Sequence, residues 1–82
     1  MTKQEQEAKL EEARKLADLI EVKAVRARTI KEDWGLLENR ITDYVNYLEH
    51  YEDFKVEPEL MEYLDSYIKA EYKRLTRLEG NY

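Results

Sequence analysis

The chain has 82 residues, which is enough for one small domain. It has no cysteine, so neither disulfides nor thiolate-bound metals stabilise it. Charged residues make up 40% of it and hydrophobic residues 43%, with only two glycines and one proline, a composition that favours helices. The net charge of -5 disfavours binding to nucleic acid or to an anionic membrane. The lack of a long apolar run disfavours a membrane-spanning helix.

The N-terminal residues are polar and lack the apolar core of a signal peptide, so we expect a cytoplasmic protein. Thr2 and Glu5 form a Thr-x-x-Glu capping box, which predicts the start of the first helix. An apolar stripe with steps of three and four follows, as expected for a helix with a coiled-coil seam. Its members are Ala13, Leu16, Ile20, Ala24, Ala27, Ile30, Trp34, Leu37, Ile41, Tyr44, Leu48 and Tyr51.

Gly35 is the weak point of this stripe, because glycine costs about 1 kcal/mol inside a helix relative to alanine. Two alternatives stay open. The stripe keeps its register across Gly35, which favours a continuous or kinked helix. A full reversal is nearly as well supported, since Asp33, or Thr29 with Glu32, could cap a new helix.

The second boundary is marked by Pro58, which suits the first position of a helix and disfavours helical geometry at Glu57. The last helix is predicted from Pro58 to about Leu78, with Gly80-Asn81 as its stop. The expected fold is all-α. A long N-terminal helical arm (1–34), kinked or broken near Gly35, precedes an antiparallel hairpin (36–79) with its turn at 54–57. The whole is either coiled-coil-like or a small three-helix bundle.

The arm has little chain to pack against, and a domain of this size buries a marginal core. We therefore expect helices from a partner or a second copy to cover the stripe, with a homo-oligomer expected and a dimer favoured. The residues assigned to oligomerisation are Leu16, Ile20, Ala24, Ala27, Ile30 and Trp34. For Trp34, ordinary core packing is the stronger interpretation and a binding hot spot the weaker one.

Tyrosines and acidic residues gather in the hairpin, and interfaces are enriched in tyrosine. The turn is expected to fold the pairs Tyr47/Tyr51 and Tyr63/Tyr67 towards each other. The alternative is that these tyrosines fill half-buried core edges with their hydroxyls in water. The residues assigned to partner binding are Tyr44, Tyr47, Tyr51, Tyr63, Tyr67, Glu49, Glu52, Asp53 and Glu57. Basic stretches lie elsewhere, at residues 23–31 and 69–77, and this segregation can steer a partner or simply be solvated.

Catalytic chemistry has little support. His50, the single histidine, lies beside Glu49 and Asp53 and could act as a general base. A lone histidine on a charged helix is far more often solvent-exposed, and no glycine-rich loop or cysteine accompanies it. We expect a protein that is not an enzyme and has no cofactor or metal.

The segment Met61-Glu62-Tyr63-Leu64-Asp65-Ser66-Tyr67-Ile68 resembles the Ser-x-x-Leu-Asp-x-x-Ile signature of the short helical-hairpin aspartyl-phosphate phosphatases of Bacillus sporulation. Arg40 and Ile41 resemble the basic-then-aliphatic entry of that family's first helix, and the similarity covers residues 37–72. Met61 replaces the signature serine, and the long N-terminal helix is extra. The resemblance implies that Asp65 acts on a response-regulator phosphate.

Three functional hypotheses follow. The favoured one is a small acidic helical module, of the kind found in phages and mobile elements, that regulates or inhibits a partner protein by binding it. In a variant of it, the acidic residues near 49–65 mimic nucleic acid. The second is a structural coiled-coil subunit or adaptor of a larger assembly. The third is the phosphatase-like regulator.

Overall fold

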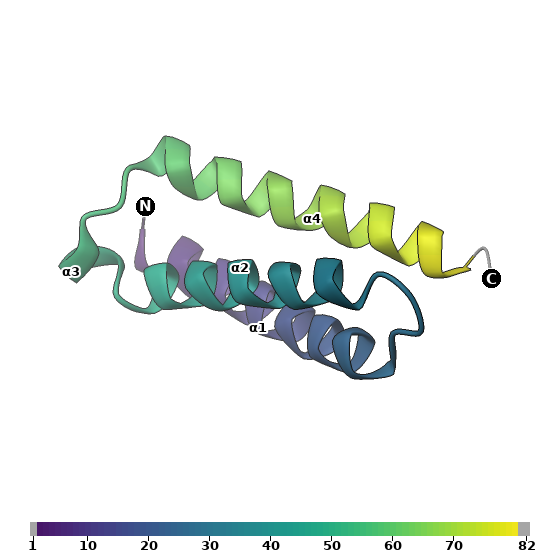
Figure 1. Cartoon of the computed structure of the whole chain (residues 1–82). Coiled ribbons are helices and arrows are strands. Elements are labelled where there is room, and N and C mark those ends of the chain that lie inside the picture. Colours follow the sequence, from purple (N-terminus) through teal and green to yellow (C-terminus); the bar gives the residue numbers. More distant parts are fainter. Residues whose placement is uncertain (1, 81–82) are drawn as a thin grey trace.

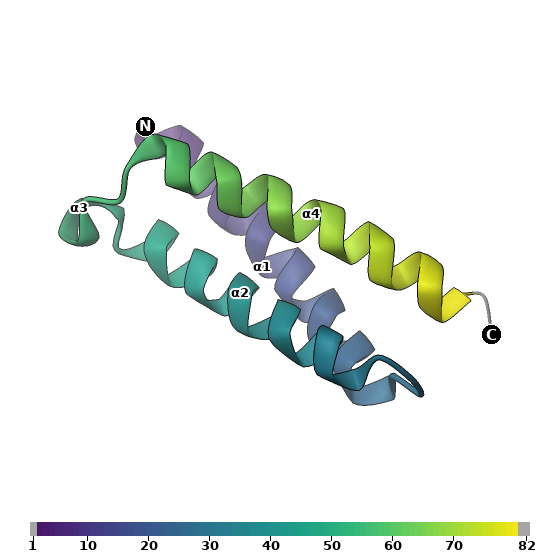
Figure 2. The same cartoon turned by 45° about the horizontal axis from the view of Figure 1, so that its top comes forward.

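The computed structural model describes residues 2–80, which form three long helices and one short helix. They are α1 (Lys3–Arg26), α2 (Lys31–Glu49), the single-turn α3 (Tyr51–Phe54) and α4 (Pro58–Gly80). The long helices run side by side, with α2 antiparallel to both α1 and α4 (Figures 1 and 2). The bundle measures 42 × 19 × 17 Å. The all-α prediction is confirmed, and the three-helix bundle is the form that occurs.

Helix α1 starts where the capping box predicted. The hydroxyl of Thr2 accepts a hydrogen bond from the backbone N–H of Glu5 at 3.1 Å. The Thr2 carbonyl also accepts from the N–H of Gln6 at 3.0 Å, the first bond of the helical ladder. None of the described helices is long and apolar enough to cross a bilayer.

The chain reverses at residues 27–30, upstream of Gly35, and the continuous helix from Thr2 to Asp53 does not form. Gly35 lies inside α2, so it neither breaks nor ends the helix. Ile30 takes the left-handed conformation at the N-terminal end of α2 (φ 42°, ψ 33°), without a side-chain cap. The Thr29 hydroxyl donates to a carboxylate oxygen of Glu79 at 3.3 Å instead of pairing with Glu32.

The stripe keeps its register across this reversal because the turn residues themselves face the core. Ala27 is buried in the turn, and Ile30 packs against the core cluster. A hydrophobic pattern without a break is therefore compatible with a full turn when the turn is short and apolar.

The second turn lies close to its predicted place. After α3, Lys55 takes the left-handed conformation (φ 49°), and its N–H donates to the Tyr51 carbonyl at 3.1 Å. Pro58 is the first residue of α4, as predicted, and the helix continues to Gly80. The predicted stop at Asn81 lies outside the described residues.

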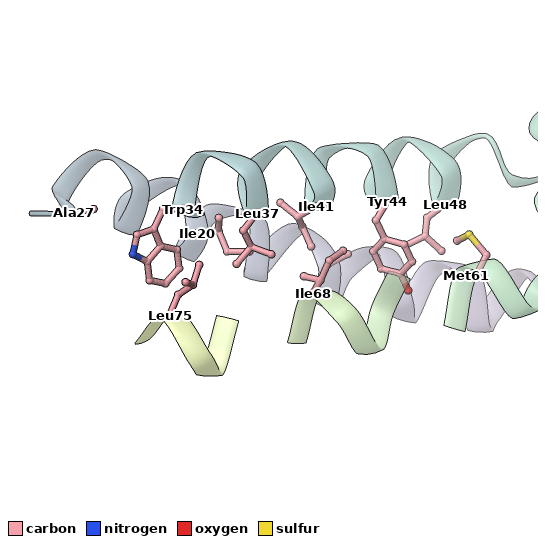
Figure 3. Packing of buried hydrophobic residues seen from close by; sticks show 11 residues of the cluster. Ile20, Ala27, Trp34, Leu37, Ile41, Tyr44, Leu48, Met61, Ile68 and Leu75 are labelled. Atoms are coloured by element: carbon pink, nitrogen blue, oxygen red, sulfur yellow. The ribbon is translucent and has the colours of Figure 1, made fainter. Parts of the chain in front are cut away.

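The core is a column of buried side chains spaced seven residues apart, with α2 along one side of it and α4 along the other (Figure 3). Helix α1 contributes Ala13 and Ile20, the turn contributes Ala27, and α4 contributes Met61, Ile68 and Leu75. Helix α2 contributes Trp34, Ile41 and Leu48, together with Leu37 and Tyr44.

The residues assigned to oligomerisation pack within this single chain. Ile20, Ala27 and Trp34 are buried in the column, whereas Leu16, Ala24 and Ile30 are partly buried against it. The stripe of α1 is therefore covered by α2 and α4 of the same chain. Its apolar character by itself no longer requires a second copy.

Candidate partner-binding surface

The five tyrosines assigned to partner binding divide into three groups. Tyr44 is buried in the core, because its spacing from Ile41 and Leu48 keeps it in phase with the stripe. Tyr47 and Tyr51 are partly buried against the core cluster. Tyr63 and Tyr67 are 62% and 39% exposed, so of the five tyrosines these two are the exposed ones.

Tyr63 and Tyr67 lie one turn apart on α4 and stack on each other, with ring centroids 6.1 Å apart and planes inclined by 21°. The hollow beside them is lined by Arg40 of α2 and by Leu64. At the other end of α2, Tyr47 instead meets Phe54 edge to face, with centroids 5.9 Å apart. The aromatic contacts of Tyr47 and of Tyr63/Tyr67 are therefore separate, and within residues 2–80 the expected meeting of the two tyrosine pairs does not occur.

The exposed tyrosines belong to a larger surface, which we call the α2/α4 face. Leu36, four residues before Arg40, is 61% exposed, and Leu60, three residues before Tyr63, is 45% exposed. Residues at these spacings share one side of a helix. The face comprises Leu36, Arg40 and Tyr47 from α2, and Leu60, Tyr63 and Tyr67 from α4.

Two arginines of the bundle, Arg14 and Arg74, form ion pairs, whereas Arg40 does not in the described part of the chain. Arg14 lies 2.9 Å from a carboxylate oxygen of Glu49, and Arg74 forms two hydrogen bonds with Glu71. Within residues 2–80, Arg40 has no carboxylate within 4.0 Å, and it borders the tyrosine hollow instead. The α2/α4 face thus carries a guanidinium group that is available for a charged partner.

Sequence reasoning missed Leu36, Leu60 and the role of Arg40 at this surface. A signal was present, because Leu60, Tyr63 and Tyr67 recur at steps of three and four. That series is out of phase with the buried residues Met61 and Ile68. A second apolar stripe on one helix indicates a second contact surface.

The acidic tip, formed by Glu49, Glu52, Asp53 and Glu57, lies at the end of the bundle that holds α3 (Figure 1). These side chains are exposed, and Glu49 is the one that pairs with Arg14. His50 is 3.7 Å from the Asp53 carboxylate and meets Phe54 edge to face. The tip is thus a solvated end, adjacent to the α2/α4 face at Tyr47 but distinct from its tyrosine hollow.

Basic residues gather at the opposite end, where the turn at 27–30 and the C-terminal part of α4 meet (Figure 1). They include Lys23, Arg26, Arg28, Lys31, Lys73 and Arg77. The folded molecule is therefore an elongated body with charge of opposite sign at its two ends. Such a body has an orientation-dependent interaction with any charged partner.

Asp65, implied as catalytic by the phosphatase resemblance, belongs to a charged cluster between α1 and α4. The Lys69 ammonium lies 2.8 Å from Glu12 and 3.2 Å from Asp65. The hydrogen bond and charge of Lys69 lower the pKa of Glu12, and Glu12 in turn raises the pKa of Lys69. Burial, reinforced by the charge of Asp65, raises the pKa of Tyr44 to about 12. This cluster links α1 to α4, and the role of Asp65 in it is to pair with Lys69.

No group of three or more histidine, aspartate or glutamate side chains within residues 2–80 is arranged to hold a metal ion. Comparison of the chain with protein-family models, curated proteins and solved structures finds no match.

Proposed function

We propose that this protein is a small helical interaction module that regulates or inhibits a partner protein by binding it through the α2/α4 face. The observation that best supports this proposal is the exposed Tyr63/Tyr67 stack beside Arg40. Tyrosine and arginine are the residue types most enriched among binding hot spots, together with tryptophan. Exposed aromatic and aliphatic side chains gathered at helical spacing on α4 are the kind of apolar surface that marks a contact site.

The occupant we propose is an amphipathic helix of the partner that carries a carboxylate opposite Arg40. Between α2 and α4 lies a hollow lined by Arg40, Tyr63, Leu64 and Tyr67, and exposed leucines flank it on each helix, Leu36 on α2 and Leu60 on α4. A helix laid along this hollow extends the bundle to four helices. An aspartate or glutamate of that helix would form an ion pair with Arg40, which has no charged partner within residues 2–80.

Paired variants of exposed residues test this proposal without disturbing the core. Tyr63→Ser with Tyr67→Ser removes the aromatic stack, and Arg40→Glu reverses the charge. Val25→Ser, at a residue on α1 that is 77% exposed, is the matched control. Affinity capture from the native cell should lose the partner with both face variants, by at least about tenfold in affinity, and keep it with the control.

A charge exchange then identifies the occupant. Substitution of one acidic residue on the partner's helix by arginine should restore binding to Arg40→Glu. Retention of the partner by both face variants would remove the α2/α4 face from the proposal. Loss of binding on neutralising Glu52, Asp53 and Glu57, with the tyrosine variant unaffected, would instead favour the acidic tip and nucleic-acid mimicry.

The alternative function is a structural subunit or adaptor of a larger assembly. It is favoured by the register of the stripe, which runs unbroken from Ala13 to Tyr51 as in a continuous coiled coil. Light scattering of the purified chain separates the two functions, because a stable high-order oligomer without a partner contradicts a free-standing inhibitor. The phosphatase-like function stays a prediction from resemblance, and no contact of Asp65 favours it over the structural role.

A further inference from the structure

The turn between α1 and α2 is built from residues that are poor at turning. Residues 27–30 read Ala-Arg-Thr-Ile, without the glycine, asparagine, aspartate or proline that tight turns favour. Ile30 adopts a positive φ of 42°, which is strained for a β-branched side chain. No side chain caps α2 at this end. The closed turn therefore costs energy that a straight helix through these residues would not.

The register of the core across this turn is the second observation. Buried positions recur every seven residues from Ala13 to Leu48, and Ala27 and Trp34 are the two that flank the reversal. Ala27 and Ile30 accommodate this register in the closed bundle, but a turn does not itself require the two helices to share one phase. A continuous helix does, because only a shared phase places the α1 half and the α2 half of the stripe on one side.

We infer that α1 and α2 join into one helix in a second state, in which two copies of this chain exchange their α1 segments. The joined helix from Lys3 to Glu49 is about 70 Å long at 1.5 Å per residue. Two such helices run antiparallel and cross near the former turn at residues 27–30. Each α1 then packs on α2 and α4 of the other copy.

The contacts of the monomer are reproduced between the copies in this dimer. Arg14 pairs with Glu49, Gln6 donates to the Leu48 carbonyl and Lys69 pairs with Glu12, each across the two chains instead of within one. Exchange of an identical element needs no new interface, and a short strained hinge promotes it. The inference does not rest on the proposed function, although the dimer would carry two α2/α4 faces.

Position 28 offers a matched pair of variants. Ala27 has an extended conformation (φ -61°, ψ 132°), which is the geometry that the residue before a proline prefers. Arg28 lies outside the helices and is not among the residues with positive φ, so Arg28→Pro is compatible with the closed turn, whereas a proline there interrupts a continuous helix. Arg28→Ala makes the same charge change and allows both states.

The experiment is to unfold each chain in denaturant, refold it at millimolar concentration and measure mass by light scattering. We expect a dimer for the wild type and Arg28→Ala. Arg28→Pro should weaken dimerisation by at least about a hundredfold. Ile30→Gly, which relieves the strain of the closed turn, should weaken it by about tenfold for each of the two turns. Circular dichroism checks that every variant is folded.

A distance measurement distinguishes exchange from simple surface association. The chain has no cysteine, so Glu7→Cys and Asn46→Cys give two specific sites for spin labels. These helix ends lie side by side in the closed bundle, but about 58 Å apart on a joined helix. Labelled chain refolded with excess unlabelled chain should show the long distance in the dimer. A monomer at all concentrations, a dimer with the short distance, or equal dimerisation of Arg28→Pro and Arg28→Ala would overturn the inference.

Discussion

Trp34 of α2 and Tyr72 of α4 meet edge to face, with ring centroids 6.0 Å apart and planes inclined by 75°. Such a pair contributes about 0.5–1.5 kcal/mol beyond its buried area. We expect Tyr72→Leu to lower the free energy of unfolding by about 1 kcal/mol, whereas Tyr72→Phe keeps the ring contact and changes it little. Trp34 is the single tryptophan, so its fluorescence during urea unfolding measures both variants. Equal stability of the leucine and phenylalanine variants would contradict a specific aromatic contribution.

Tyr44 should make the bundle sensitive to alkali. Burial raises its pKa to about 12, above the value of 10.0 that applies to the unfolded chain. Below pH 10 the hydroxyl is protonated in both states and the stability is fully present. Between pH 10 and about 12 only the unfolded chain releases the proton, so stability falls as pH rises, by up to about 1.4 kcal/mol per unit.

Tyr44→Phe isolates this effect, because it removes the ionisable hydroxyl and keeps the ring. We expect its free energy of unfolding to fall less steeply than that of the wild type between pH 10 and 12. The raised pKa of Lys69 adds a loss of stability with rising pH that both proteins retain. Tyr63→Phe, at an exposed ring, serves as control and should follow the wild-type curve. Identical alkaline curves for all three chains would contradict the shift.

Helix ends with a specific local chemistry were predictable from the sequence. Thr2 caps α1 because its hydroxyl accepts from Glu5, and Pro58 begins α4 because proline suits a first helical turn. In both cases the residue that determines the boundary is at the boundary. These ends therefore required no knowledge of the tertiary structure.

The first turn was not predictable in this way. Its residues carry no turn chemistry, and Ile30 adopts a conformation that its own side chain disfavours. Packing of α1 against α2, with Ile20 and Trp34 in one core, outweighs that local cost. Gly35 is the weakest helix former in the stripe, but one glycine costs too little to end a helix that is buried on one side.

The exposure of the tyrosines assigned to partner binding was predictable only in part. Tyr63 and Tyr67 are exposed, as a binding role requires, but Tyr44 is in the core because it is in phase with Ile41. The sequence spacing between each tyrosine and the buried residues of its helix indicates whether that tyrosine faces the core or the solvent. The proximity of Arg40 to Tyr63 depends on how α2 and α4 pack, and local patterns do not determine that arrangement.

The Glu12–Lys69 ion pair joins α1 to α4, but both side chains are about half exposed. Solvent screening limits such pairs to about 1 kcal/mol or less. A double-mutant cycle with Glu12→Gln and Lys69→Met should give a coupling free energy in that range, smaller in 1 M salt. Because the pKa of Glu12 is lowered from 4.5, its contribution is present above that pH and is lost as the pH falls through the folded value. A coupling that grows with salt would contradict this account.

Gly35→Ala should stabilise the protein, because the position combines a helical backbone with free space. Gly35 lies in the first half of α2 without a positive φ, and a Cβ added there meets no atom within 4 Å. Alanine in a helix interior is favoured over glycine by about 0.5–1 kcal/mol. We expect thermal unfolding to shift upward by a few degrees, by about 4–8 °C per kcal/mol in a domain of this size. Gly80→Ala, at the last residue of α4 and equally unobstructed, is the control and should change the midpoint less. A lower midpoint for Gly35→Ala would mean that this glycine is needed for a bend or contact that the bundle does not display.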